Sequence, residues 1–86
     1  MVMKDVVYSK SAQKTLLRIP RNWAIRIREK INAYAVDPAS QANNVKALQG
    51  SEGILRLRVG DWRITMLDGV VLEILEVKPR GSAYKE

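Results

Sequence analysis

The chain has 86 residues, no cysteine, no histidine and a formal net charge of +6, with an isoelectric point near 10.0. These values predict one small domain, residues 1–86, and exclude disulfides, Cys/His zinc sites and acid–base catalysis by histidine. Residues 1–8 lack the apolar run of a signal peptide, and no apolar stretch approaches the roughly 20 residues that cross a bilayer. We therefore expect a cytoplasmic protein that binds no membrane.

Cationic side chains are concentrated in the first half of the chain. Between residues 10 and 30 the only acidic residue is Glu29, against seven cations: Lys10, Lys14, Arg18, Arg21, Arg26, Arg28 and Lys30. Such a cluster favours a polyanionic partner, with nucleic acid as the first candidate. The alternative is that these charges only keep a small surface soluble.

Residues 4–8 are predicted to form a short strand, because they include two valines and a tyrosine. Either Ser9 or Ser11 can cap the helix that follows. The apolar residues of this helix recur at helical spacing through Ile19, and Pro20 ends it.

A second helix is predicted from Arg21 to about Val36. Its cationic residues lie away from an apolar stripe made of Ala24, Ile27, Ile31, Tyr34 and Ala35. Asp37-Pro38 ends the helix, since the residue before proline disfavours helical geometry. Residues 38–53 are predicted to be a loop that could hold one helical turn, anchored by Val45 and Leu48.

Three strands are predicted next, over residues 54–59, 62–67 and 70–77, with Asp68-Gly69 as a hairpin turn. The third strand has apolar residues on both faces, which suits a central position. Counting through both turns places eight residues on the face that docks the helices: Leu55, Leu57, Val59, Trp62, Ile64, Met66, Val71 and Leu75. The opposite face then carries Arg56, Arg58, Arg63 and Thr65, with Ile74 beside them. In this register Glu73 falls on the apolar face, so either it is peripheral or the strand contains a bulge.

The fold class is α+β: an N-terminal strand and a two-helix hairpin packed on a small antiparallel sheet of about four strands.

The run Arg56-Leu57-Arg58-Val59-Gly60-Asp61-Trp62-Arg63 carries the strongest functional signal. Gly60-Asp61 fits a two-residue type II′ turn, which pairs Val59 with Trp62 and sets Arg58 opposite Arg63. Like charges placed across a strand pair destabilise it, so an anion is expected there, and guanidinium groups grip phosphate oxygens in pairs. The alternative is an ordinary solvated sheet face.

The C-terminal residues could add to this site. Pro79 is expected to end the sheet, so that Arg80 and Tyr84 fold back over the arginines. Tyr84 could cover the edge of the core or stack on a nucleobase. Trp62 is interpreted as core packing, whereas Trp23 fits either the core or a partner surface.

The whole pattern resembles the RelE/ParE superfamily of type II toxin–antitoxin toxins. The resemblance covers nearly the entire chain and is carried by VKALQG at residues 45–50, LRLRVGDWR at residues 55–63, and VKPRGSAY at residues 77–84. The C-terminal arginine and tyrosine are similar to the RelE-like branch, whose toxins cut mRNA in the ribosomal A site.

The resemblance implies that the nucleotide's own 2′-hydroxyl attacks the adjacent phosphate, without metal or other cofactor. Arg56 and Arg58 match the family's basic strand pair, and Arg63 matches the arginine that grips the phosphate. Arg80 matches the arginine near the leaving 5′-oxygen, and Tyr84 matches the tyrosine that stacks on the mRNA base. The implied partners are the ribosome, mRNA and a cognate antitoxin. The surface that binds ribosomal RNA would comprise Lys46 and the seven helix cations listed above.

The chain departs at two places from the family that it resembles. Some members of that family have lysine where this chain has Arg56 and Arg58, and a histidine often stands where Pro79 lies. Arginine is a poor general base because its pKa exceeds about 12, so the proton could pass to Glu76, Tyr84 or solvent. Two other functions remain open: a ParE-like inhibitor of DNA gyrase, and a repurposed family member that only binds nucleic acid or a partner.

Overall fold

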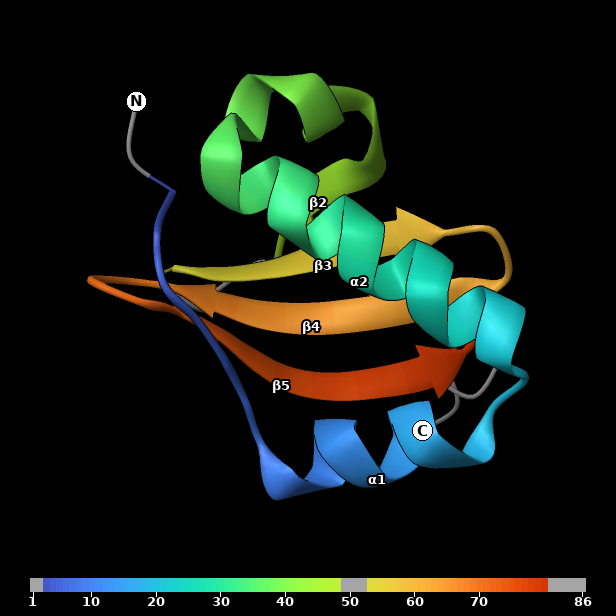
Figure 1. Ribbon diagram of the computed structural model, residues 1–86. Helices are drawn as coiled ribbons and strands as arrows, with labels where there is room; N and C mark the ends of the chain where they lie inside the picture. Colours follow the sequence, from blue (N-terminus) through green and yellow to red (C-terminus); the bar gives the residue numbers. More distant parts are fainter. Residues whose placement is uncertain (1–2, 49–52, 81–86) are drawn as a thin grey trace.

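The computed structural model describes residues 3–48 and 53–80, which form a five-stranded sheet with two α-helices (Figure 1). The elements follow in the order β1 (Val6–Tyr8), α1 (Lys10–Arg18), α2 (Arg21–Val36), the 3-10 helix η1 (Pro38–Asn44), β2 (Val45–Ala47), β3 (Ile54–Val59), β4 (Trp62–Asp68) and β5 (Leu72–Pro79). The α+β class is confirmed, with one strand more than the four predicted.

The strands lie in the order β1-β5-β4-β3-β2. β1 and β5 run parallel, and the other neighbouring pairs of described strands are antiparallel. β5 therefore has a strand on both sides, as its apolar sequence predicted. The strand missed by the sequence analysis is β2, where Lys46 pairs with Arg56 at the sheet edge.

Local side-chain contacts fix the ends of the helices. Ser9, and not Ser11, caps α1: its hydroxyl oxygen accepts a hydrogen bond from the Ala12 amide at 3.0 Å and donates to the Leu75 carbonyl at 2.7 Å. Pro20 precedes α2, and Asp37 ends it. Ser9 thus joins the first turn of α1 to β5.

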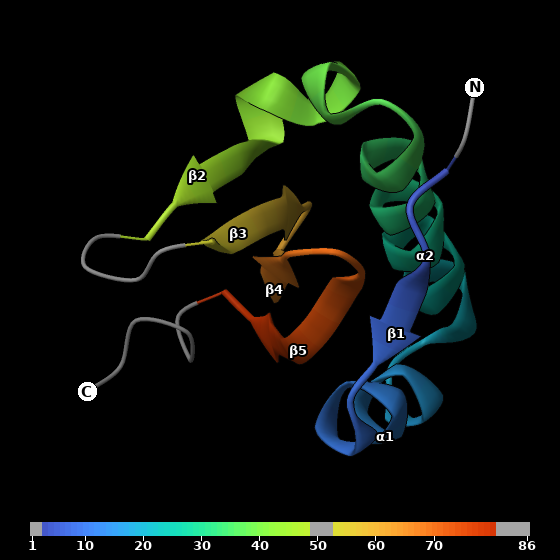
Figure 2. The same cartoon turned by 90° about the vertical axis from the view of Figure 1, so that its left-hand side faces the viewer.

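Both α-helices lie on the same face of the curved sheet, as the view in Figure 2 shows. All five residues of the predicted α2 stripe are buried there, together with Ala12 and Leu16 of α1. The sheet contributes Leu57, Val59, Ile64, Met66, Leu72, Ile74 and Val77. Among the described elements, no helix covers the opposite face, which we call the outer face.

The register of β5 corrects the prediction. Asp68 pairs with Leu72, so the β4–β5 loop has three residues and not two, and this odd shift exchanges the faces of the strand. Ile74 is fully buried, whereas it was expected beside the arginines. Val71, expected in the core, is exposed in the loop.

A β-bulge changes the register a second time. Thr65 pairs with Glu76 but Met66 pairs with Ile74, which leaves Leu75 as the extra residue. Leu75 is half-buried and does not belong to the core cluster, contrary to the prediction. Pro79 also differs from the expectation, because it ends β5 opposite Trp62 instead of lying outside the sheet.

Candidate nucleic-acid interface

The β3–β4 hairpin has the predicted register. Val59 pairs with Trp62, and Arg58 lies directly opposite Arg63. Gly60 has φ +58° and no described non-glycine residue has positive φ, so the turn has its positive φ only at the first central position, as type II′ requires. Gly60 also lies against the Trp23 ring: a Cβ at residue 60 would be 2.5 Å from Cη2 of that ring.

Two rows of side chains cross the outer face of the sheet. Residues paired across neighbouring strands project to the same face. The registers therefore define one row of Lys46, Arg56, Thr65 and Glu76, and a second row of Arg58, Arg63 and Lys78. Together the rows hold five cations and one carboxylate, and Glu76 Oε2 lies 3.7 Å from Lys78 Nζ. This face can attract an anion with more than one negative charge.

The turn itself orients Arg63. Nη1 of Arg63 donates hydrogen bonds to the carbonyl oxygens of Gly60, at 3.0 Å, and Trp62, at 3.1 Å. The Arg80 amide donates to the Asp61 carbonyl, and Arg80 Nη1 lies 3.9 Å from Asp61 Oδ1 in an exposed ion pair. The same two-residue turn therefore places both arginines.

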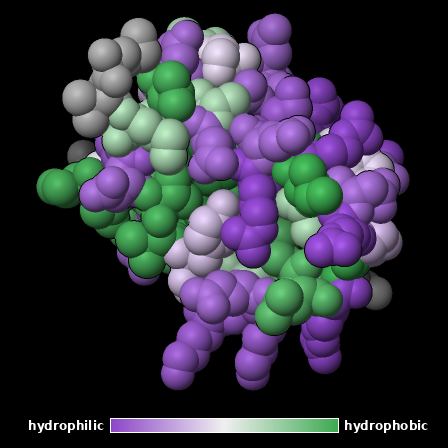
Figure 3. All heavy atoms as spheres, viewed as in Figure 1, coloured by the Kyte–Doolittle hydropathy of each residue, from purple (hydrophilic) through white to green (hydrophobic). Residues whose placement is uncertain are grey.

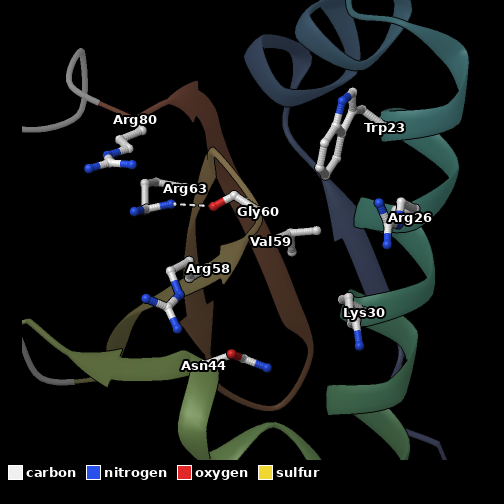
Figure 4. Close-up of a pocket in the computed structure, with 9 residues that line it drawn as sticks. All are labelled: Trp23, Arg26, Lys30, Asn44, Arg58, Val59, Gly60, Arg63 and Arg80. Atoms are coloured by element: carbon white, nitrogen blue, oxygen red, sulfur yellow. Dashed lines mark hydrogen bonds between the residues drawn. The ribbon is translucent and has the colours of Figure 1, made fainter.

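A cavity of about 720 Å³ lies at this end of the molecule (Figure 4). It is lined by Trp23, Arg26, Lys30, Asn44, Arg58, Val59, Gly60, Arg63 and Arg80, and none of these nine residues is acidic. A second cavity of about 290 Å³ adds Lys46 and Arg56 to Arg58 and Arg63. The described part of the chain thus brings together four of the five predicted catalytic residues, whereas Tyr84 lies outside the described residues.

The predicted ribosome-binding cations do not form one surface. Lys10, Lys14 and Arg18 are exposed along α1 and line neither of these cavities. Figure 3 shows hydrophilic side chains projecting from the helix-bearing side of the molecule. Arg21 and Arg28 border a more apolar cavity of about 350 Å³ between the helices, and the Arg28 guanidinium lies 4.9 Å from the centre of the Tyr8 ring. Of the helix cations, Arg26 and Lys30 line the cavity that contains the arginines.

Two residues that were not predicted also belong to this region, Lys78 and Asn44. Lys78 would have been found by counting two residues on from Glu76, but the assumed two-residue β4–β5 loop placed the strand in the wrong register. Asn44 gave no signal, because its position depends on β2, which was not predicted, and on η1, for which only one helical turn without bounds was expected. Trp23 packs against the core, which confirms one of the two interpretations offered for it, and it also lines the cavity. The partner surface stays a prediction.

A different polar cluster lies at the other end of β4. Asp68 accepts hydrogen bonds from the Tyr34 hydroxyl, at 2.7 Å, and from the Lys4 ammonium group. Desolvation of Asp68 would raise its pKa, but the hydrogen bonds from both partners and the charge of Lys4 outweigh it and lower the pKa. Burial and the Asp68 carboxylate raise the pKa of Tyr34 to about 12. This cluster ties the start of the chain to α2 and β4.

The described residues contain neither a cluster suited to a metal ion nor a membrane-spanning helix. No group of three or more acidic side chains there could hold a metal ion. None of the helices described is long and apolar enough to cross a bilayer.

Comparisons with known proteins agree with this architecture. The profile of a family described as the ParE toxin of the type II toxin–antitoxin system parDE matches residues 6–84. Among curated protein sequences, none matches the chain. These results define the chain as a toxin of a toxin–antitoxin system. It belongs to the ParE toxin family, within the RelE/ParE superfamily.

Solved structures of RelE toxins have the same fold. The archaeal RelE–RelB complex from Pyrococcus horikoshii OT3 matches with a TM-score of 0.79 and 27% identity, over 93% of this chain and 98% of that chain. The RelB–RelE antitoxin–toxin complex from Methanococcus jannaschii matches with a TM-score of 0.69 and 25% identity, over 91% and 94% of the two chains. The isolated E. coli RelE toxin shares the fold at 13% identity, with a TM-score of 0.76 over 90% and 84% of the chains.

Proposed function

We propose that this toxin is a ribosome-dependent mRNA endonuclease. The observation that carries the proposal is the convergence of Arg58, Arg63 and Arg80 on one cavity whose described lining contains no carboxylate. Paired guanidinium groups suit a phosphodiester because each presents several donors in a fixed plane. Arg56 joins them through the adjoining cavity, and Tyr84 is the fifth proposed catalytic residue.

The proposed reaction is an internal transesterification. The 2′-oxygen of one nucleotide attacks the neighbouring phosphorus and loses its proton to a base. The bond from phosphorus to the 5′-oxygen breaks, and that oxygen takes up a proton. The products are a 2′,3′-cyclic phosphate and a 5′-hydroxyl. Negative charge accumulates on the phosphoryl oxygens in the transition state, where guanidinium groups stabilise it.

A carboxylate is available as the proton acceptor. Glu76 lies in the same cross-strand row as Arg56, separated from it by Thr65. Because arginine stays protonated, we assign the role of base to Glu76, with Tyr84 and solvent as the alternatives.

The test is induction of the toxin in growing cells, with mapping of 5′-hydroxyl ends on translated messages. We expect new ends for the parent chain, strong loss of these ends for Arg63→Ala, and unchanged ends for a control at the exposed residue Asn32, Asn32→Ala. The proposal fails if translated messages gain no ends, or if Arg63→Ala cuts as the parent does.

A second candidate function is inhibition of DNA gyrase. It is favoured by the family profile, which is that of ParE toxins. Purified toxin would then block DNA supercoiling by gyrase and leave mRNA intact. The two assays together distinguish a nuclease from a protein-binding toxin.

A cognate antitoxin is the proposed partner. The relatives from Pyrococcus horikoshii and Methanococcus jannaschii are in complexes with RelB. With a net charge of +6, this chain is complementary to an acidic segment laid across the outer face. Co-expression with the antitoxin should abolish the mRNA ends, and the two proteins should co-purify.

A further inference from the structure

The large cavity reaches past the outer face of the sheet. β2 pairs with β3 only from Leu55 to Leu57, so the described strands leave Arg58 and Val59 without a neighbour on that side. Asn44 and α2 border this gap. In Figure 4, Arg58, Arg63 and Arg80 extend to one side of the hairpin, whereas Trp23, Arg26 and Lys30 are carried by α2 on the other.

The α2 side of the cavity is itself cationic. Arg26 and Lys30 are four residues apart and therefore neighbours on one helix face, an arrangement of like charges that destabilises a helix. The Arg26 guanidinium lies 5.1 Å from the centre of the Trp23 ring, and that ring is in turn held against Gly60. Trp23 thus positions Arg26 at the cavity, next to the turn that orients Arg63.

The charge of the whole cavity indicates the size of its ligand. Five cations from α2, β3, β4 and the residue after β5 line it, and none of its described lining residues is acidic. One phosphodiester carries one negative charge and can neutralise only part of this array. A ligand with several phosphates in a row can reach both sides, and a volume of about 720 Å³ is within the range of ligand sites.

We infer that Arg26 and Lys30 bind the substrate RNA strand itself, at the phosphate next to the one held by Arg58 and Arg63. This inference rests on the proposed endonuclease function. The single strand would pass around the uncovered edge of β3, from the outer face to α2. Arg26 and Lys30 are therefore substrate-binding residues, distinct from the α1 cations that line no part of this cavity.

The test is RNA binding by purified toxin, measured with 2′-O-methyl oligouridylates that cannot be cleaved. A tetranucleotide with three internal phosphates probes both sides of the cavity. UpU, with one phosphate, probes only the side that carries Arg58, Arg63 and Arg80. The variant is Arg26→Gln/Lys30→Gln. The control, Ser11→Glu/Ala39→Glu, removes the same net charge at exposed positions in the first turns of α1 and η1, where acidic residues are tolerated.

We expect the variant to bind the tetranucleotide about tenfold more weakly and to bind UpU as the parent does. Because Arg26 and Lys30 share one phosphate, the variant should also reduce the slope of log affinity against log salt by roughly 0.7. The control should change tetranucleotide binding less than about twofold, since its charges lie outside the cavity.

Four results would overturn the inference: no tetranucleotide binding by the parent, equal losses in the variant and the control, equal losses for tetranucleotide and UpU, or a loss of antitoxin affinity with RNA binding intact. The last result would assign the α2 side to a protein partner. Failure of the proposed function would be seen separately, as an absence of mRNA ends from a toxin that still binds the tetranucleotide through α2.

Discussion

Gly60→Ala, in the β3–β4 turn, should destabilise the toxin more than Gly69→Ala, in the β4–β5 turn, does. Two costs add at Gly60. Its φ of +58° is the left-handed region, which costs a residue with a Cβ about 1–2 kcal/mol. The new methyl group would also lie 2.5 Å and 2.7 Å from Cη2 and Cζ3 of Trp23, so the ring must move.

The overlap with Trp23 sets the larger part of the effect. Trp23 packs against the core, and forcing an extra methyl group into packed surroundings costs about 1–3 kcal/mol. The total is therefore about 2–5 kcal/mol, a large part of the roughly 5–15 kcal/mol that stabilises a typical domain. For a domain of this size, the melting temperature should fall by about 10 °C or more.

The assay is urea unfolding followed by circular dichroism, with Gly69→Ala as the matched control. A Cβ at Gly69 would meet its nearest neighbour, the Val71 carbonyl oxygen, at 3.8 Å, which is ordinary contact. Trp23→Leu in the Gly60→Ala background should recover about 1–3 kcal/mol by removing the overlap. The reasoning is refuted if Gly60→Ala and Gly69→Ala lose equal stability, or if the effects of Gly60→Ala and Trp23→Leu are additive.

Three further predictions concern single side chains. Tyr34→Phe should cost about 1–2 kcal/mol at pH 7 through the lost bond to Asp68. In the parent, this contribution should be lost at low pH, below the usual pKa range of an aspartate, because the pKa of Asp68 is lowered. It should also be lost as the pH rises from 10 through about 12, where Tyr34 ionises. Urea unfolding should therefore show the stabilities of the parent and the variant converging at both ends of this pH range. Ser9→Ala should cost about 1–2 kcal/mol by urea unfolding, because both hydrogen bonds of the hydroxyl disappear, whereas Ser11→Ala should be nearly neutral. Arg63→Lys keeps the charge but loses the planar fork, so mRNA cleavage should fall roughly 10- to 100-fold with stability almost unchanged, and equal rates would contradict the assigned role.

Most of the helical part of the fold could be predicted from the sequence. The α2 stripe is regular over 16 residues, and Pro20 and Asp37-Pro38 mark its ends with backbone chemistry that no tertiary contact overrides. The β3–β4 hairpin could be predicted for the same reason, since Gly60 fixes the turn type and hence every pair along it.

The errors came from features that depend on contacts distant in sequence. β2 has three residues and exists because it pairs with β3, so its own pattern carries no strand signal. The register of β5 depends on a three-residue loop and on a bulge at Leu75. A strand that is apolar on both faces does not reveal the length of the loop, and only the misplaced Glu73 indicated that the strand could contain a bulge. These errors hid Lys78 and moved Ile74 to the wrong face.

The geometry of the site follows from one short turn. Gly60 admits the Trp23 ring, which holds Arg26, and its carbonyl accepts from Arg63, while the Asp61 carbonyl accepts from the Arg80 amide. Cations from three parts of the chain therefore depend on the same two residues, so a change in this turn should reduce anion binding together with stability. Because these cations repel one another in the free protein, a polyanion that spans them should also stabilise the fold, by an amount that rises with its concentration relative to its dissociation constant. The mutual repulsion of the cations thus links the folding of this toxin to its affinity for any polyanion that spans them.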